Sequence, residues 1–361
     1  ASYNLINFLK SKGHDVKVIC CDNDKDESQE GFVFLNQVNL GPLNKIVERN
    51  GVSLPHKDKK LIVETIKGCD ILHIMMPFPV GIAACKIAKK LGKPVTAGFH
   101  CQAELVSSHL GLMNCEPVNR LIYKGFYDKL YQFCDAIHYP TQFICDVFEN
   151  IVGPTNHYII SNGVNKYMEH KKCEKPENLK DKFVILSTGR LCKEKAHIIL
   201  FKAVALSKYN KDIQLVIAGQ GPLQGRLEKF AEENIANKPI IKYFSRDEMV
   251  DLVNFSDLYV HPAEAELEGI ACLEAIVCGL VPVVSNSRKS ATKDFAITDK
   301  NLFQYDDPQD LANKIDYWIE HPQEKEEYKT KYLQFGEKFN QEDCMNKMEE
   351  MFMETLNKRI K

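Results

Sequence analysis

Two kinds of segment alternate along this chain of 361 residues, and the alternation restarts once. Short apolar runs at 15–20, 70–75, 93–100 and 135–140 are separated by longer segments with helical periodicity. Such alternation is typical of parallel sheets covered by helices on both faces, because each parallel strand needs a crossover to reach the next. The sequence therefore predicts an α/β protein with two Rossmann-like, doubly wound domains that face each other across a cleft.

A polar segment separates the two series of strands. Residues 165–182 hold many charged and few apolar side chains, which is typical of a linker. We therefore expect an N-terminal domain at residues 1–164, a linker at 165–182, a C-terminal domain at 183–325 and charged helices at 326–361. We expect these last helices to pack on the second domain through an apolar stripe.

The chain opens on a helical pattern. Leu5, Ile6, Phe8 and Leu9 share one face of a helix that ends at Gly13. A parallel sheet seldom begins with a helix, so we expect a preceding strand and its turn to lie outside the given sequence.

Charge and cysteine usage exclude several classes of protein. The formal net charge is -2, so no global basic field favours nucleic acid. The 13 cysteines form no CxxC pair and lie mostly in apolar runs, which indicates buried thiols in a reducing cytosol rather than disulfides or a zinc site. No apolar run is long enough for a transmembrane helix, and no signal peptide is recognisable.

Two cations follow the strand pattern at 183–188. Gly189 ends the strand, Arg190 comes next and Lys195 lies five residues further on. Ligands of open α/β sheets bind beyond the carboxyl ends of the strands, and an arginine with a lysine at that place suits a diphosphate. The alternative interpretation is a solvated helix start with surface cations.

A glycine pair follows the next strand. Gly219 and Gly221 permit a tight turn and a close approach of the backbone to a ligand. An ordinary turn between a strand and a helix explains them equally well.

Four glutamates occupy the otherwise apolar segment 261–287. Gly269 interrupts it, which predicts a helix at 270–278 with Gly279 as its C-terminal cap. Glu274 lies inside this apolar helix and needs a partner, either a structural cation or the hydroxyls of a ligand, whereas the N-terminus of the helix is suited to a phosphate. Glu266 and Glu268 precede the helix in a loop, and we expect Glu264 to be exposed.

These motifs, in this order, resemble one known family. The sequence GRLCKEK at 189–195, GQGP at 219–222, and two glutamates separated by seven residues at 266 and 274 are similar to the donor domain of retaining glycosyltransferases of family 4, which have the GT-B fold. The resemblance covers nearly the whole chain.

The resemblance implies roles for particular residues. It implies that Glu266 touches the transferred sugar, that His100, at the end of a first-domain strand, reaches the sugar hydroxyls, and that Glu274 holds the ribose. A satisfied turn residue is the alternative for His100. The remaining donor-binding residues supply cations, glycine turns or phosphate-capping amides: Gly189, Arg190, Lys195, Gly219, Gly221, Gly269, Ile270 and Ala271.

Three positions depart from the family pattern. Glu268 replaces the usual phenylalanine, Ala196 replaces the usual glycine after the motif lysine, and Asn165 replaces an aspartate. We expect Glu268 to add negative charge beside the sugar pocket.

Within the family, segments 96–112, 119–143 and 261–275 look most like bacterial glucosyltransferases that act on diacylglycerol. The resemblance implies that a hexose, most simply glucose, is transferred from a UDP-sugar to a lipid hydroxyl with retention of the anomeric configuration. It implies that the reaction needs no metal or cofactor. It also implies that the enzyme is cytoplasmic or bound peripherally to a membrane. Alternatives are a glycan or polyprenyl-linked acceptor in envelope polysaccharide synthesis and a nucleotide-sugar binding protein without catalysis.

Two basic segments are candidates for contact with an anionic membrane surface. Residues 86–93 end a basic amphipathic helix, and 119–133 place aromatic side chains at helical spacing beside Arg120, Lys124 and Lys129. A core-facing aromatic stripe with solvated lysines is an equally good interpretation of each segment.

Overall fold

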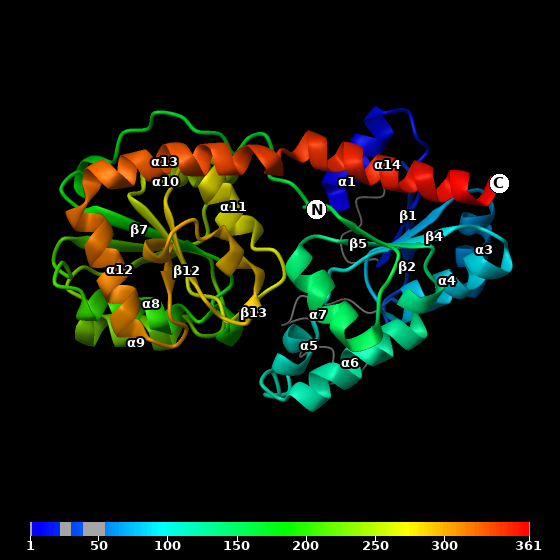
Figure 1. The fold of residues 1–361 in the computed structure, drawn as a ribbon, viewed down its shortest axis with the longest axis horizontal. Coiled ribbons are helices and arrows are strands. Elements are labelled where there is room, and N and C mark those ends of the chain that lie inside the picture. The colour runs from blue at the N-terminus through cyan, green and yellow to red at the C-terminus, as the bar shows by residue number, and fades with distance from the viewer. Residues whose placement is uncertain (1, 22–29, 39–54, 361) are drawn as a thin grey trace. The chain divides into compact units, whose positions relative to one another are not determined.

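The computed structural model describes residues 2–21, 30–38 and 55–360, which divide into two compact units (Figure 1). Unit 1 contains residues 1–103, 115–160 and 345–361, and unit 2 contains 104–114 and 161–344. Both units hold parallel sheets with helices, so the predicted α/β class is confirmed.

Unit 1 is built on a parallel sheet in the order β3-β4-β5-β6, with a separate parallel pair β1-β2. Its strands are β1 (Val18–Cys21), β2 (Phe32–Leu35), β3 (Leu72–Ile74), β4 (Val95–Gly98), β5 (Ala136–Tyr139) and β6 (His157–Ile159). Its helices are α1 (Ser2–Ser11), α3 (Lys59–Lys67), α4 (Pro79–Lys90), α6 (Glu116–Lys129), α7 (Gln142–Val152) and most of α14 (Gln341–Ile360).

An aromatic cluster fills the core of unit 1. The ring of Phe99 lies 4.7–6.2 Å, centre to centre, from the rings of Tyr123, Tyr131, Tyr139 and Phe148. Tyr123 and Tyr131 are buried, so of the two interpretations of the aromatic stripe at 119–133 the core-facing one holds for these side chains. Helical spacing in the sequence shows that these side chains share one face of a helix, but it does not show whether that face contacts the core or the solvent.

Unit 2 contains a parallel six-stranded sheet in the order β14-β12-β10-β7-β8-β9. Its strands are β7 (Phe183–Thr188), β8 (Ile213–Ala218), β9 (Ile240–Lys242), β10 (Leu258–His261), β12 (Pro282–Ser285) and β14 (Leu302–Phe303). A short parallel pair, β11 (Ala265–Glu266) and β13 (Lys289–Ser290), lies apart from this sheet. Because β7 is the first strand and sits in the middle, the strand order reverses between β7 and β10.

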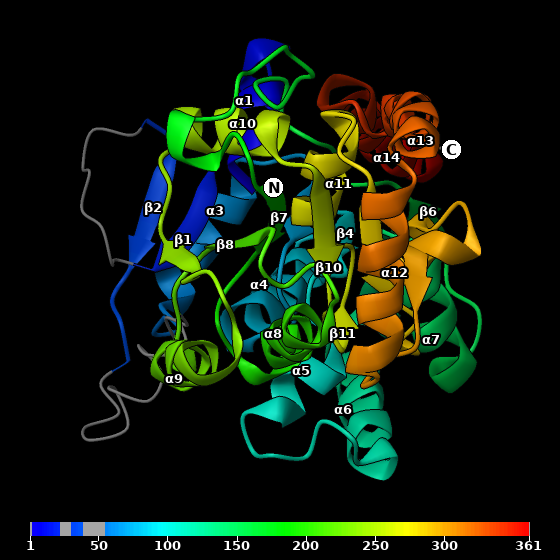
Figure 2. The same cartoon turned by 90° about the vertical axis from the view of Figure 1, so that its left-hand side faces the viewer.

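Helices cover both faces of this sheet (Figures 1 and 2). Helices α8 (His197–Leu206), α9 (Gln224–Asn234) and α12 (Pro308–Glu320) pack together on one face. Helices α10 (Arg246–Phe255), α11 (Ile270–Val277) and α13 (Pro322–Gly336) cover the other, where α11 packs on α13. Between β4 and β5 the chain forms two helices, α5 (Ala103–Ser108) and α6.

The structure groups two segments differently from the expected domain boundaries. Residues 161–182 belong to unit 2, because Met168 and Leu179 are buried in its core. Residues 345–361 belong to unit 1, where Glu349 accepts a hydrogen bond from His14 at 2.6 Å and Glu354 accepts one from Tyr158 at 2.6 Å.

None of the helices in the described ranges has both the length and the apolar character needed to cross a lipid bilayer.

Ala196 has a left-handed backbone conformation (φ 51°, ψ 29°) directly before α8. This conformation costs roughly 1–2 kcal/mol for a residue with a Cβ, whereas glycine loses about 0.5–1 kcal/mol more in ordering. We expect Ala196→Gly to raise the free energy of unfolding in urea by about 0.5 kcal/mol. Ala203→Gly, inside the same helix, is the control and should lower that free energy by about 1 kcal/mol. Destabilisation by both changes would contradict the prediction.

Candidate functional site

The candidate site lies in unit 2, beyond the carboxyl ends of β7 and β10. These two strands are parallel neighbours, and the strand order reverses between them. The chain leaves β7 through Gly189 and Arg190 and leaves β10 toward Glu264, Glu266 and Glu268. A strand order that reverses opens a crevice at this place in open α/β sheets.

The loops after β7 and β8 pack backbone against backbone. The N–H of Leu191 donates to the carbonyl of Gln220 at 3.0 Å, and the N–H of Leu223 donates to the carbonyl of Leu191 at 3.0 Å. A Cβ at Gly219 would overlap the carbonyl oxygen of Gly189, and one at Gly221 would lie 2.5 Å from the carbonyl oxygen of Leu191. The two glycines therefore permit a close approach to the neighbouring loop.

Lys195 and Glu266 form an ion pair at the centre of the site. The Lys195 side chain extends over Gly189, which has a φ of 134°, and its ammonium contacts Oε2 of Glu266. The same Oε2 lies 3.2 Å from Nε2 of His261. Burial alone would raise the pKa of Glu266, but the Lys195 charge and the hydrogen bond from His261 bring it down to about 2. The carboxylate is therefore ionised at neutral pH.

Two residues of this centre were not singled out from the sequence. His261 is the last residue of β10, and Tyr259 lies two residues earlier on the same face of that strand. The Tyr259 hydroxyl lies 3.3 Å from Nδ1 of His261 and 2.6 Å from Oγ1 of Thr188, the last residue of β7. Their positions at neighbouring strand ends were the signal that could have identified them.

Helix α11 begins as the sequence predicts. Gly269 has a φ of 84°, and a Cβ there would overlap the Thr292 side chain, so both conformation and space require glycine. Within the described residues, the backbone N–H groups of Ile270 and Ala271 donate to no acceptor. These two amides at a helix N-terminus can bind an anion.

Glu274 lies on the half-buried face of α11, with Ile270 and Val277. Burial raises the pKa of its carboxyl. Its carboxylate makes no hydrogen bond or ion pair with any residue that the structure describes. Of the two partners that the sequence left open, a structural cation is therefore not found in the described chain.

Glu264 is buried, with 6% of its surface exposed, so the expectation of an exposed side chain is wrong. Oε1 of Glu264 accepts a hydrogen bond from Nζ of Lys289 at 2.7 Å, and the same ammonium contacts Asn114. Pairing of β11 with β13 brings Lys289 beside this segment. Nothing in the local pattern of residues 261–287 reveals that pairing.

Glu268 is buried and hydrogen-bonded. Its Oε1 accepts from the Ser161 hydroxyl at 2.6 Å and from the Asn162 backbone N–H at 2.9 Å, and its Oε2 accepts from the Asn162 side-chain amide. Burial raises the pKa of Glu268, and these hydrogen bonds oppose the shift. The carboxylate that departs from the family pattern is thus directed at residues 161–162.

Arg190 is exposed directly after Gly189, at the edge of the same loop.

His100 belongs to unit 1 and is described there alone. Its ring folds back over Gly98, where a Cβ would overlap Nε2, and its centre lies 5.5 Å from the ring of His138. Burial, together with the neighbouring His138, lowers the pKa of His100 to about 3, so its ring is neutral at physiological pH. A neutral imidazole at a strand end can donate to or accept from a hydroxyl.

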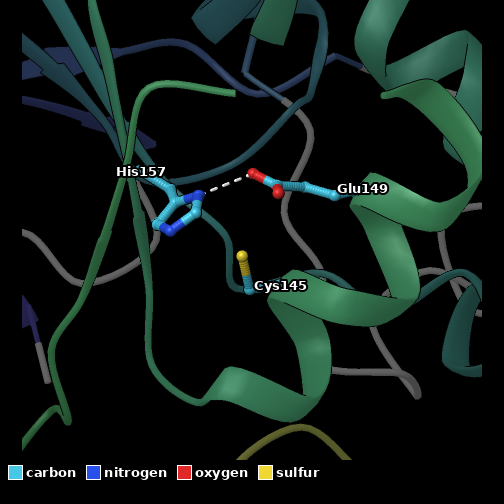
Figure 3. A group of neighbouring side chains, drawn as sticks. All are labelled: Cys145, Glu149 and His157. Atoms are coloured by element: carbon cyan, nitrogen blue, oxygen red, sulfur yellow. Dashed lines mark hydrogen bonds and ion pairs between the residues drawn. The ribbon is translucent and has the colours of Figure 1, made fainter. Parts of the chain in front are cut away.

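Cys145, Glu149 and His157 form a cluster of metal-ligand types in unit 1 (Figure 3). Their ligand atoms lie within 4.8 Å of one another. Oε1 of Glu149 already accepts from the Thr155 N–H at 3.0 Å and the Thr155 hydroxyl at 2.6 Å, and lies 2.7 Å from Nδ1 of His157. Burial and the Glu149 charge raise the pKa of the Cys145 thiol to about 12. The contacts explain the cluster as a hydrogen-bonded link between α7 and β6.

Two family models match consecutive parts of the chain. Residues 2–166 match the model described as Glycosyltransferase Family 4, and residues 169–334 match the model of glycosyl transferases group 1.

Among curated proteins, the alpha-monoglucosyldiacylglycerol synthase of Streptococcus pneumoniae is 22% identical over 232 residues, which are 60% of this chain and 52% of that protein. The chain spans about half the length of the first curated relatives it matches. Other relatives have names that specify GDP-mannose or a diphospho-undecaprenol acceptor, so donors and acceptors vary among them.

Among solved structures, Anabaena HepE in complex with UDP and glucose has a TM-score of 0.72 and 15% identity, and the match covers 94% of this chain and 100% of that chain. The two share a fold. The catalytic domain of the cholesterol-alpha-glucosyltransferase of Helicobacter pylori is 40% identical over 43% of this chain and 96% of that chain, with a TM-score of 0.41.

The contact between the loops after β7 and β8 predicts the effect of a single methyl group. We expect Gly219→Ala to lower the free energy of unfolding by about 2 kcal/mol, because its Cβ must push the Gly189 carbonyl away. Gly225→Ala, in α9 with no heavy atom within 4 Å of the added Cβ, is the matched control and should raise it by about 0.5 kcal/mol. Equal effects in urea denaturation would contradict the proposed loop contact.

Proposed function

The chain belongs to the family 4 glycosyltransferases, which have the GT-B fold, and we propose that it transfers a hexose from a UDP-sugar to a lipid hydroxyl. Glucose is the hexose that we propose. We propose that the configuration of the anomeric carbon is retained. The observation that carries the proposal is the arrangement of Lys195, Glu266 and the open N-terminus of α11 at one strand edge.

The donor diphosphate finds positive charge from three sources in this arrangement. Arg190 and Lys195 supply cations, and the amides of Ile270 and Ala271 supply two hydrogen-bond donors at the positive end of a helix. The bond that breaks joins the anomeric carbon to a phosphate oxygen, and negative charge grows on that oxygen as the bond lengthens. These groups can stabilise that charge without a divalent ion, so we propose a metal-independent reaction.

Glu266 is the carboxylate proposed to face the sugar. Its carboxylate pairs with Lys195, whose ammonium is also proposed to bind the diphosphate. A diphosphate therefore competes with Glu266 for the same cation. Once Lys195 turns toward phosphate, the ionised carboxylate can accept a hydrogen bond from a sugar hydroxyl and stabilise positive charge at the anomeric carbon. His100 is proposed to bind the sugar as well.

The acceptor is proposed to be diacylglycerol at the inner face of a membrane. The name of the S. pneumoniae relative supports this acceptor. Helix α6 adds an exposed strip with Arg120, Lys124 and Leu121, which is 71% exposed, and such a strip can bind anionic lipid headgroups. On this proposal the enzyme is cytoplasmic and binds the membrane peripherally.

An acceptor assay tests the proposal. The chain is incubated with UDP-glucose and mixed micelles that contain diacylglycerol, a sterol or an undecaprenyl diphosphate-linked glycan. We expect glucosyl-diacylglycerol as the main product. Transfer only to the glycan would support the alternative role in polysaccharide synthesis. Transfer only to the sterol would mean that the acceptor is a sterol and not diacylglycerol. UDP binding without any transfer would indicate a binding protein.

Two variants are the controls in this assay. Glu266→Gln should abolish transfer without weakening UDP binding, because the amide keeps the shape, loses the charge and no longer competes with the diphosphate for Lys195. Arg190→Ala should weaken UDP binding about tenfold or more, because a charge-assisted bond is lost. The reverse pattern in calorimetry would mean that the two roles are exchanged.

Glu274 has no partner in the described chain and is proposed to hold the ribose hydroxyls. We expect Glu274→Ala to weaken UDP binding about tenfold, since charged hydrogen bonds contribute about 1.5–3 kcal/mol. Binding of 2′,3′-dideoxy-UDP is the matched control: the wild-type protein should prefer UDP, whereas the variant should bind both equally. A variant that still discriminates between them would place the ribose elsewhere.

A further inference from the structure

We propose that Thr188, Tyr259 and His261 form a hydrogen-bond relay that positions Glu266 and keeps its carboxylate in place when the donor takes Lys195 away. The inference rests on the proposed role of Glu266 at the sugar. Thr188, Tyr259 and His261 act through Glu266 in this proposal, so all three are positioning residues.

The four groups are connected without a break. Oγ1 of Thr188 lies 2.6 Å from the Tyr259 hydroxyl, which lies 3.3 Å from Nδ1 of His261, whose Nε2 lies 3.2 Å from Oε2 of Glu266. Thr188, Tyr259 and His261 are at most 8% exposed, so bulk solvent has little access to them. The relay spans the ends of β7 and β10, which are hydrogen-bonded neighbours.

The protonation states give the relay one direction. The Glu266 carboxylate is ionised and can only accept, so Nε2 of His261 must donate to it. Burial lowers the pKa of His261, the carboxylate of Glu266 opposes that shift, and the Lys195 charge adds to it, so the ring is neutral and Nδ1 accepts. The Tyr259 hydroxyl, whose pKa is raised by burial, therefore donates to Nδ1 and accepts from the Thr188 hydroxyl.

This direction fixes the histidine tautomer. With Tyr259 donating to Nδ1, the ring proton resides on Nε2 and points at Glu266. Without that hydroxyl, the two neutral tautomers would differ less in energy, and the Nδ1–H form would set a lone pair of Nε2 against the carboxylate.

The two carboxylate oxygens of Glu266 are used unequally. Both Lys195 and His261 contact Oε2, whereas Oε1 takes no hydrogen bond from any residue in the described part of the chain. The relay thus holds one oxygen and leaves the other for a sugar hydroxyl. When a diphosphate draws Lys195 away, His261 still binds Oε2, and the orientation of the carboxylate is retained.

Four variants of the full chain test the relay by kcat, KM and the Kd for UDP. Tyr259→Phe should lower kcat about tenfold and leave the Kd for UDP unchanged, because one neutral hydrogen bond is lost. His261→Phe should lower kcat about a hundredfold, and His261→Gln, which keeps an N–H donor, should restore part of that loss. Tyr332→Phe is the matched control: Tyr332 is buried in the same unit, and its hydroxyl donates to Phe295 outside the site.

The tautomer is read directly from nitrogen NMR of histidine-labelled protein, with His261→Gln to assign the signal. We expect His261 to be neutral with its proton on Nε2 in the wild type, and to keep this tautomer in Tyr259→Phe with a shifted Nδ1 signal, because Glu266 still accepts from Nε2 while the hydrogen bond to Nδ1 is lost. A proton on Nδ1 in the wild type would overturn the relay, as would equal losses of kcat in Tyr259→Phe and Tyr332→Phe. Absence of hexosyl transfer by the wild type would overturn the proposed function instead, and the NMR result would still decide the relay.

Discussion

The parallel sheet of unit 2 starts with its middle strand, and this constraint determines where the site lies. Because β7 comes first, the chain must build β8 and β9 on one side and then return to build β10 on the other. The loops after β7 and β10 therefore diverge from neighbouring strand ends. Lys195 comes from one of these loops and Glu266 from the other, so residues 71 positions apart form an ion pair.

Four glutamates lie within eleven residues, and each carboxylate meets a different environment. Glu264 binds Lys289, Glu266 binds Lys195 and His261, and Glu268 binds Ser161 and Asn162. Only the carboxylate of Glu274 lacks a partner in the described chain. Burial of a charge is unfavourable unless it is compensated, so the protein itself compensates three of these carboxylates, and the fourth is the one for which we propose a ligand.

The sequence predicted what depends on local pattern. The helix at 270–278, its glycine ends and the strand at 183–188 match α11 and β7, because periodicity and left-handed glycines are local signals. The burial of Glu264 and the partners of Glu268 depend on contacts with residues 289 and 161–162, which no local pattern shows. His261 and Tyr259 were overlooked because a histidine and a tyrosine in an apolar strand look like ordinary core residues until their neighbours are known.

Main-chain hydrogen bonds join the Gly189–Leu191 loop to the loop that begins at Gly219, and neither Gly219 nor Gly221 has room for a Cβ. A main-chain contact offers no side chain for natural selection to adjust, and a larger residue at either glycine disrupts it. A change of donor preference is therefore easier to make at positions that flank this contact, where a new side chain does not displace the backbone of the neighbouring loop.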